Sequence, residues 1–236
     1  MKKYSCPSCG AALVFQSSLS VYAVCAYCSA TVVRHDVNLE AIGTMAALPD
    51  DMSPFQVGTE AYYRGNHFTL IGRMKVGWKN GVWNEWFMMT DDGRKGWLAE
   101  AQGFYAVCFE VENAMAPEME QLVRQRVLEF MKLGTKTKSS QSSMGSLHHQ
   151  QLGAYITLNR QKLRVVDIKH AMCIGSEGEL PFAAPWGRKS ISIDLLGPDG
   201  EFGCVEVIDQ EIRVFVGHYV DWADLRCERL REIEGW

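Results

Sequence analysis

Four cysteines in the first 28 residues limit most strongly what this chain can fold into. They form two pairs, Cys6-Pro-Ser-Cys9 and Cys25-Ala-Tyr-Cys28, with fifteen residues between the pairs. A pair of this spacing can direct both sulfur atoms at one ion from a single tight turn, and two such turns joined by a hairpin complete a tetrahedron around zinc. Because thiolates would fill all four positions, none remains for a catalytic water. The spacing therefore predicts a zinc ribbon that binds one structural Zn²⁺.

The same two pairs could instead form disulfides or redox-active dithiols. The chain starts Met-Lys-Lys-Tyr-Ser-Cys, without the apolar segment of a signal peptide, so we expect a cytoplasmic and reducing setting that disfavours disulfides. A thioredoxin-like βαβ pattern around the pairs is missing as well. The other four cysteines share no such spacing, and we expect them to be small buried hydrophobes. They are Cys108, Cys173, Cys204 and Cys227.

Composition excludes several broad classes of protein. Among the 236 residues, 47% are hydrophobic and 22% are charged, which is typical of a globular chain and argues against general disorder. The formal net charge of -4 argues against a uniformly basic nucleic-acid-binding surface. A run of about 18 apolar residues is absent, so the sequence predicts no membrane-spanning helix.

After residue 55 the sequence changes to short β-prone runs separated by turn signals. Asn80-Gly81 and Asp92-Gly93, placed between alternating runs, are strong hairpin signals. The first group of expected strands is 60–63, 67–76, 82–90, 95–101 and 104–111. The second group is 154–158, 162–168, 189–196, 201–208 and 212–219. Each group predicts an antiparallel meander that could close into a small barrel.

The two groups share turn residues at matching places. Gly58 matches Gly153, and Asp92-Gly93 matches Asp199-Gly200, with the extra residues of the second group falling in 173–187, an expected long loop or hairpin. This pattern favours a duplicated module, although any two meanders can resemble each other by chance.

Helical periodicity appears once, over residues 117–133, where apolar residues recur at spacings of three and four. Such a stripe packs into a core or docks onto a partner. Residues 135–151 are rich in Ser, Gln and Lys, which is typical of a flexible linker.

The fold class expected is mainly β, with a zinc ribbon, two tandem small antiparallel barrel or meander units, and one amphipathic helix between them. The expected domains are 1–34 (ribbon), 35–54 (a connector with a short helical turn around 39–45), 55–112 (first β unit), 113–151 (helix and linker) and 152–236 (second β unit).

Several longer motifs resemble one family. They are Gly58-Thr59-Glu60, residues 68–73, Trp83-Asn84-Glu85-Trp86, Asp92-Gly93-Arg94, residues 96–103, and the closing stretches 215–220 and 230–236. Together with the cysteine pairs, they resemble the bacterial family catalogued as domain of unknown function 4178. The resemblance covers most of the chain outside the helix and the Ser-rich stretch. It implies no assigned activity; the usual gene neighbours of the family, membrane-associated and polyamine-synthase-like proteins, suggest an accessory role in an envelope or stress system.

The first β unit carries the residues that we expect to bind a partner. Trp83, Glu85, Trp86, Arg94 and Trp97 lie in or near two consecutive strands, and the second unit has no matching tryptophan or acid. Trp and Arg are enriched among residues that dominate binding energies. Alternation along a strand places Trp83 and Trp86 on opposite faces, so one of them could simply fill the core.

Three functions follow from these residues. The leading hypothesis is a non-catalytic adaptor or scaffold that binds protein partners and meets a membrane only indirectly, with no catalytic residues; its partners and oligomeric state are not indicated. Nucleic-acid binding through the ribbon is an alternative, but Lys2, Lys3 and Arg34 leave little positive charge once a zinc tetrathiolate is counted. The other alternative is an enzyme of unrecognised type centred on Glu85, together with Glu100 or Asp92.

Overall fold

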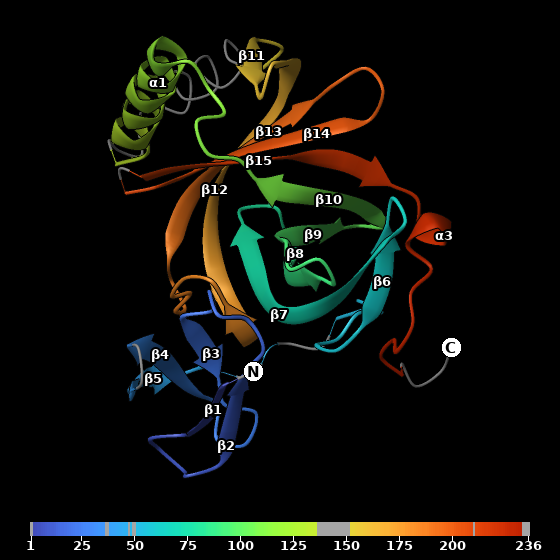
Figure 1. Cartoon of the computed structure of the whole chain (residues 1–236). Helices are drawn as coiled ribbons and strands as arrows, with labels where there is room; N and C mark the ends of the chain where they lie inside the picture. Colours follow the sequence, from blue (N-terminus) through green and yellow to red (C-terminus); the bar gives the residue numbers. More distant parts are fainter. Residues whose placement is uncertain are drawn as a thin grey trace. The chain divides into compact units, whose positions relative to one another are not determined.

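The computed structural model describes residues 2–35, 38–46, 48, 51–135, 152–209 and 211–232, and its strands are antiparallel (Figure 1). The chain divides into two compact units that are not consecutive along the sequence. Unit 1 comprises Met1–Val107, Met172–Arg188 and Val220–Trp236, and unit 2 comprises Cys108–Ala171 and Lys189–Tyr219. This division differs from the consecutive ranges 55–112 and 152–236 that we expected. The reason is the length of strand β12 (Gln161–Leu180), which passes from unit 2 into unit 1.

The N-terminal part of unit 1 consists of five short strands. They are β1 (Lys2–Ser5), β2 (Ala12–Phe15), β3 (Tyr22–Val24), β4 (Ala30–His35) and β5 (Asn38–Thr44). β1 pairs with β2, and β3, β4 and β5 form a second antiparallel set. The helical turn expected around 39–45 is therefore wrong. The segment is a strand because its backbone pairs with β4, from His35 opposite Asn38 to Ala30 opposite Thr44.

The first predicted meander is present in unit 1. Its strands are β6 (Glu60–Tyr63), β7 (Asn66–Trp78), β8 (Gly81–Thr90), β9 (Lys95–Ala101) and β10 (Phe104–Glu110), of which β10 ends in unit 2. They lie side by side in chain order. The turn at Asn80-Gly81 joins β7 to β8 and the turn containing Gly93 joins β8 to β9, as the hairpin signals predict.

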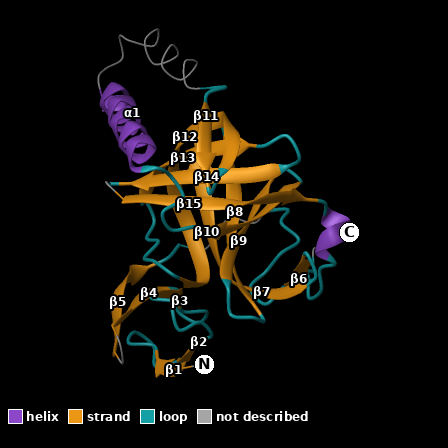
Figure 2. Ribbon diagram, turned by 45° about the horizontal axis from the view of Figure 1, so that its top comes forward, coloured by secondary structure: helices purple, strands orange, loops and turns teal. Residues whose placement is uncertain are grey.

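Unit 2 contains the second group of strands and the predicted helix. β11 (Tyr155–Leu158) pairs with the start of β12, and β13 (Lys189–Leu196), β14 (Glu201–Ile208) and β15 (Glu211–Val220) follow as a meander. Helix α1 (Pro117–Thr135), drawn in purple in Figure 2, lies between the two strand groups in the sequence. Residues 136–151, most of the expected linker, lie outside the described part.

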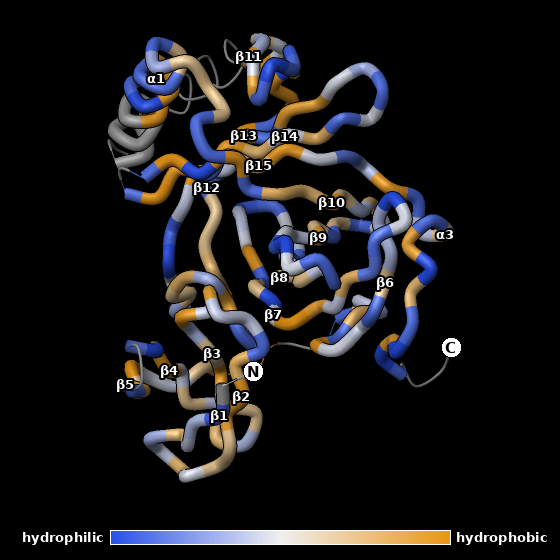
Figure 3. The backbone as a smooth tube through the Cα atoms, in the orientation of Figure 1, coloured by the Kyte–Doolittle hydropathy of each residue, from blue (hydrophilic) through white to orange (hydrophobic). Residues whose placement is uncertain are grey.

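Apolar residues from the helix and the strands form the core of unit 2. Val123 and Val127 of α1 are buried in one cluster with Leu158, Leu195 and Val205. Figure 3 shows the matching hydrophobic stretches along β13, β14 and β15. α1 thus packs into a core through part of its surface, while Leu122 is exposed. Among the described residues, none of the helices is both long and apolar enough to cross a membrane.

The stretch 173–187, expected to be a long loop or hairpin, is strand over residues 173–180 and turn or irregular after them. β12 continues to Leu180, and its second half pairs with β7 and with β3. Phe182 and Trp186 then lie in the turn region before β13. α3 (Trp222–Leu225) follows β15 in unit 1.

Gly72 permits the closest approach of β7 and β12. A Cβ atom at position 72 would overlap the carbonyl oxygen of Glu179 and lie 2.8 Å from its carbonyl carbon. We expect Gly72→Ala to destabilise the protein by about 1–3 kcal/mol, because backbone atoms must move apart. Chemical denaturation would measure the loss.

Gly77→Ala is the matched control for this substitution. Gly77 lies on the same strand, but its added Cβ would meet only the Ile174 side chain, at 3.0 Å, and a side chain can move. Equal losses for the two variants would contradict the backbone explanation.

Candidate metal centre and buried polar network

The four predicted ligands converge at the N-terminal end of unit 1. Cys6 and Cys9 belong to the turn between β1 and β2, and Cys25 and Cys28 belong to the turn between β3 and β4. Their sulfur atoms all lie within 4.8 Å of one another, with Cys6 Sγ 3.8 Å from Cys28 Sγ and Cys9 Sγ 3.8 Å from Cys25 Sγ. A tetrahedral site with metal–sulfur bonds of about 2.3 Å separates its sulfur atoms by about 3.8 Å. The geometry therefore fits a metal site, and all four thiols are free of disulfides.

The two turns are built in the same way. Cys6 N–H donates to Ala11 O (2.8 Å) and Cys25 N–H donates to Ala30 O (2.9 Å). Each turn then needs a left-handed residue just after its second cysteine, which is Gly10 (φ 76°) in the first and Ser29 (φ 57°) in the second. This local backbone geometry explains why two short, separate motifs present their sulfur atoms alike.

The thiols influence one another electrostatically. Burial opposes ionisation of Cys6, but hydrogen bonds with the backbone of Cys9 and Ser8 and with neighbouring thiols lower its pKa to about 7. At Cys28 a backbone hydrogen bond from Ala30 favours the thiolate, yet the thiols of Cys9, Cys25 and Cys6 raise the pKa to about 12. Four thiolates this close require a cation, and soft divalent ions such as zinc supply one.

Glu179 of β12 connects the cysteine-bearing segment to the rest of unit 1 through hydrogen bonds. Its carboxylate accepts hydrogen bonds from the backbone N–H groups of Gln16 (2.8 Å) and Ser17 (3.2 Å). Glu179 is buried, with 4% of its surface exposed. In addition, Val21 N–H donates to Leu180 O (3.0 Å), and the Tyr22 hydroxyl lies 3.2 Å from the Ser176 hydroxyl. The segment is thus held by β12 as well as by its own small core.

A second cluster, made of charged, polar and aromatic side chains, lies on one face of β7, β8 and β9. The strand register places Arg73 opposite Trp86, Lys75 opposite Asn84, and Asn84 opposite Glu100. Directly opposed residues share a face, so the five side chains form two adjacent rows. All five are at least 93% buried, which is rare for Arg, Lys and Glu unless they are paired.

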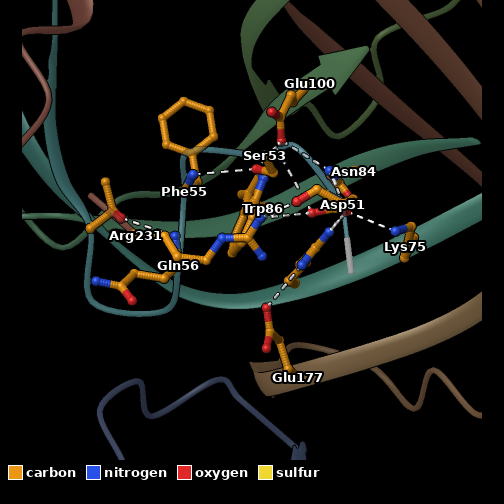
Figure 4. A network of polar contacts seen from close by, with 12 residues as sticks. Asp51, Ser53, Phe55, Gln56, Lys75, Asn84, Trp86, Glu100, Glu177 and Arg231 are labelled. Atoms are coloured by element: carbon orange, nitrogen blue, oxygen red, sulfur yellow. Dashed lines mark hydrogen bonds and ion pairs between the residues drawn. The ribbon is translucent and has the colours of Figure 1, made fainter. Parts of the chain in front are cut away.

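Segment 51–56 lies over these rows and completes their pairing (Figure 4). The Asp51 carboxylate receives Lys75 Nζ at 2.7 Å and is also contacted by Arg73 Nη2. Arg73 donates to Asn84 Oδ1 from Nε (3.0 Å) and Nη2 (2.7 Å), and its Nη1 lies 3.4 Å from Glu177 of β12. Burial opposes ionisation of Asp51, but the hydrogen bond from Lys75 and the charge of Arg73 lower its pKa overall.

Glu100 is the acceptor at the other end of the network. Its Oε2 accepts hydrogen bonds from Ser53 Oγ (2.6 Å), Asn84 Nδ2 (3.0 Å) and Trp86 Nε1 (3.0 Å). A carboxylate that accepts three hydrogen bonds fixes the positions of the side chains that donate them. Arg73 also lies over the Trp86 ring, 4.8 Å from its centroid.

A bulge in β7 produces this arrangement. Leu70 pairs with Met88 and Gly72 pairs with Phe87, so Ile71 is an extra residue in β7. Beyond the bulge, odd-numbered residues take the face that even-numbered residues occupied before it. Strict alternation along β7 would place Arg73 and Lys75 on the face opposite Phe68 and Leu70, whereas the bulge places all four side chains on one face. The network is not among the sites that the sequence predicts.

The five expected partner-binding residues are not gathered on one exposed surface. Trp86 and Trp97 are core residues, 0% and 6% exposed. Trp83 and Glu85 are half-buried, and Trp83 Nε1 donates to Glu85 Oε1 (2.9 Å). Arg94 is exposed in the turn after β8, at the end of the strand remote from Trp83, and pairs with Asp92 (2.8 Å). The expected alternation of Trp83 and Trp86 is present.

The acids considered for catalysis are also separated. Glu85 pairs with Ala99 in the register, whereas Glu100 pairs with Asn84, so Glu85 and Glu100 point to opposite faces. Asp92 lies in the exposed turn.

Comparison with known proteins identifies the family. The model of the family described as "Domain of unknown function (DUF4178)" matches residues 56–222. The chain belongs to this DUF4178 family. No curated protein and no solved structure matches the chain.

The DUF4178 match includes most of the polar network but none of the metal centre. It includes the strands that carry Arg73, Lys75, Asn84 and Glu100, but it begins after Asp51 and Ser53, and after all four cysteines. The metal centre and the segment that covers the polar network thus precede the region by which this DUF4178 chain is identified.

Proposed function

We propose that this protein is a non-catalytic zinc-ribbon adaptor that binds protein partners in the cytoplasm. The observation that carries the proposal is the closed set of four thiols, Cys6, Cys9, Cys25 and Cys28. A metal with four protein ligands has no open position for water or substrate, so it stabilises a fold rather than reacting. In this proposal the ion is one Zn²⁺ per chain.

The second cysteine turn offers a surface for a partner. Tyr27, between the ligands Cys25 and Cys28, is 80% exposed, and Leu19 in the neighbouring turn is 58% exposed. A rigid turn that presents an aromatic side chain suits protein recognition, because little side-chain entropy is lost on binding. Trp83, Glu85 and Arg94 remain candidates for further contacts, whereas Trp86 and Trp97 lie in the core.

The alternative functions receive less support. Arg34, a main source of positive charge in the ribbon, donates to Ser18 O and lies 4.9 Å from the centre of the Phe15 ring, so it is engaged within the ribbon. In the enzyme hypothesis Glu85 acts together with Glu100 or Asp92, but Glu100 lies on the other face and Asp92 lies in the exposed turn.

Co-purification tests the adaptor proposal. Tagged full-length protein from the native host should retain specific proteins, and Tyr27→Ala should reduce their recovery several-fold, because interface tyrosines often contribute about 2 kcal/mol or more. Quantitative mass spectrometry would measure recovery. Melting temperature and zinc content should stay unchanged.

Tyr155→Ala is the matched control, since Tyr155 is 56% exposed in unit 2. Equal recovery with wild type, Tyr27→Ala and Tyr155→Ala, or no retained protein at all, would refute the proposal.

A further inference from the structure

We propose that the face of β7, β8 and β9 lined by Arg73, Lys75, Asn84 and Glu100 is a recognition site for an acidic peptide, and that residues 51–55 occupy this site in cis. The partner segment would carry an acid, a hydroxyl two residues later and an aromatic residue four residues later. The inference rests on the proposed function as a protein-binding adaptor and names the chemistry of one partner.

Residues 51–55 lie on the sheet in the manner of a bound linear motif. Asp51, Ser53 and Phe55 direct their side chains into the network, whereas Met52 between them is 64% exposed. The segment belongs to no strand and contacts this face through alternate side chains. Alternate side chains that enter fixed positions give specificity in extended-peptide recognition.

The first position requires a negative charge. Arg73 and Lys75 are only 3% and 4% exposed, and both contact the Asp51 carboxylate. A buried cation whose partner is removed carries a large desolvation penalty. The site therefore favours an occupant with a carboxylate at this point and disfavours its neutral analogue.

The second and third positions of the site bind a hydroxyl group and an aromatic ring. Ser53 Oγ donates to Glu100 Oε2 at 2.6 Å, which a residue without a donor could not do. The Phe55 ring is 1% exposed and packs against Trp86, Tyr105 and Trp222, with centroids 5.9, 5.7 and 5.5 Å away. Together, the three positions define the spacing acid-x-hydroxyl-x-aromatic.

A segment near the end of the described chain holds residues 51–56 from the other side. Arg231 N–H donates to Pro54 O (2.8 Å), Arg231 Nη2 donates to Asp51 O, and Gln56 Nε2 donates to Arg229 O (3.0 Å). A tethered segment competes at an effective concentration of the order of millimolar. A partner peptide therefore binds only when it displaces this segment, so occupancy in cis restrains binding in trans.

The test uses full-length protein and a fluorescein-labelled peptide with the sequence of residues 51–59. Asp51→Asn/Phe55→Ala weakens the cis segment at two of its three positions. We expect this variant to bind the peptide at least about tenfold more tightly than wild type does, measured by fluorescence anisotropy. A peptide with Asn in place of its Asp should bind at least about tenfold more weakly.

Substitutions on the receptor face complete the test. Lys75→Gln in the double variant should abolish the gain, whereas Lys169→Gln should not, because Lys169 is an ion-paired, largely buried lysine of unit 2. If circular dichroism shows the double variant unfolded, Asp51→Asn alone provides the same comparison. The inference would be overturned if a folded variant does not bind the peptide, or if the Asn peptide binds as tightly as the Asp peptide. It would also be overturned if Lys75→Gln does not change peptide binding, or if equimolar acetate or phosphate displaces the peptide. Failed co-purification with intact peptide binding would refute the adaptor function and leave this site standing.

Discussion

Cys25→Ser should remove zinc from the protein and unfold the N-terminal segment while the meander β7–β9 stays folded. The four sulfur atoms lie within 4.8 Å of one another, and Cys25 is among the most buried members of the small core around them. Structural zinc contributes roughly 10–16 kcal/mol in small zinc-finger peptides, far more than so small a core could replace. Elemental analysis should find one zinc per wild-type chain and none retained stably by the variant.

Hydrogen exchange would locate the effect of this substitution. Amides of β1–β4 should lose protection in Cys25→Ser and after chelation of wild-type protein, and amides of β7–β9 should keep theirs. Cys227→Ser is the control, since Cys227 is half-buried and lies outside the cluster. A wild-type protein purified anaerobically without any thiophilic metal would contradict the assignment.

Arg73→Met should destabilise unit 1 by about 3–5 kcal/mol, because it leaves buried partners of a charged group unpaired. Arg73 contacts Asp51, Asn84 and Glu177 and is 3% exposed. Urea denaturation would measure the loss. Arg94→Met provides the comparison, since Arg94 pairs with Asp92 in an exposed turn and its removal should leave the midpoint almost unchanged. Similar midpoints for the two variants would show that the buried network contributes little.

The same network makes the stability of the protein depend on pH. Its surroundings hold the pKa of Asp51 below that of an ordinary aspartate, which is about 3.9 in an unfolded chain. At pH values above the unfolded-state pKa, Asp51 is ionised in both the folded and the unfolded protein, and its contribution to the unfolding free energy is complete. This contribution is lost as the pH falls through the lower pKa of the folded state. The difference in unfolding free energy between wild type and Arg73→Met should therefore shrink on acidification. A difference that grows below pH 4 would contradict this linkage.

Much of the fold follows from local patterns in the sequence. The cysteine spacing predicts the ligand set, since each pair needs only a short turn to aim its sulfur atoms. Asn80-Gly81 and Asp92-Gly93 predict the hairpins as local turn signals, and Gly93 adopts the left-handed angle (φ 81°) that favours glycine in such turns. The apolar spacing of 117–133 predicts α1. Each of these signals depends on neighbours a few residues apart, so the sequence alone contains it.

The tertiary structure decided what depends on distant residues. Residues 39–44 form part of a strand because they pair with the edge of β4, and β12 extends to Leu180 because β7 and β3 pair with it. The bulge at Ile71 placed Arg73 and Lys75 on the same face of β7 as Phe68 and Leu70, and Asp51, more than twenty residues earlier, pairs with them there. Trp86 and Trp97 lie on opposite faces of the sheet, and both are core because Phe55 packs on Trp86 and Phe182 stacks on Trp97. Local sequence determines which conformations are available to a strand, but only the elements packed against each face determine whether that face is buried, and with it whether a charged side chain lies in water or in a network.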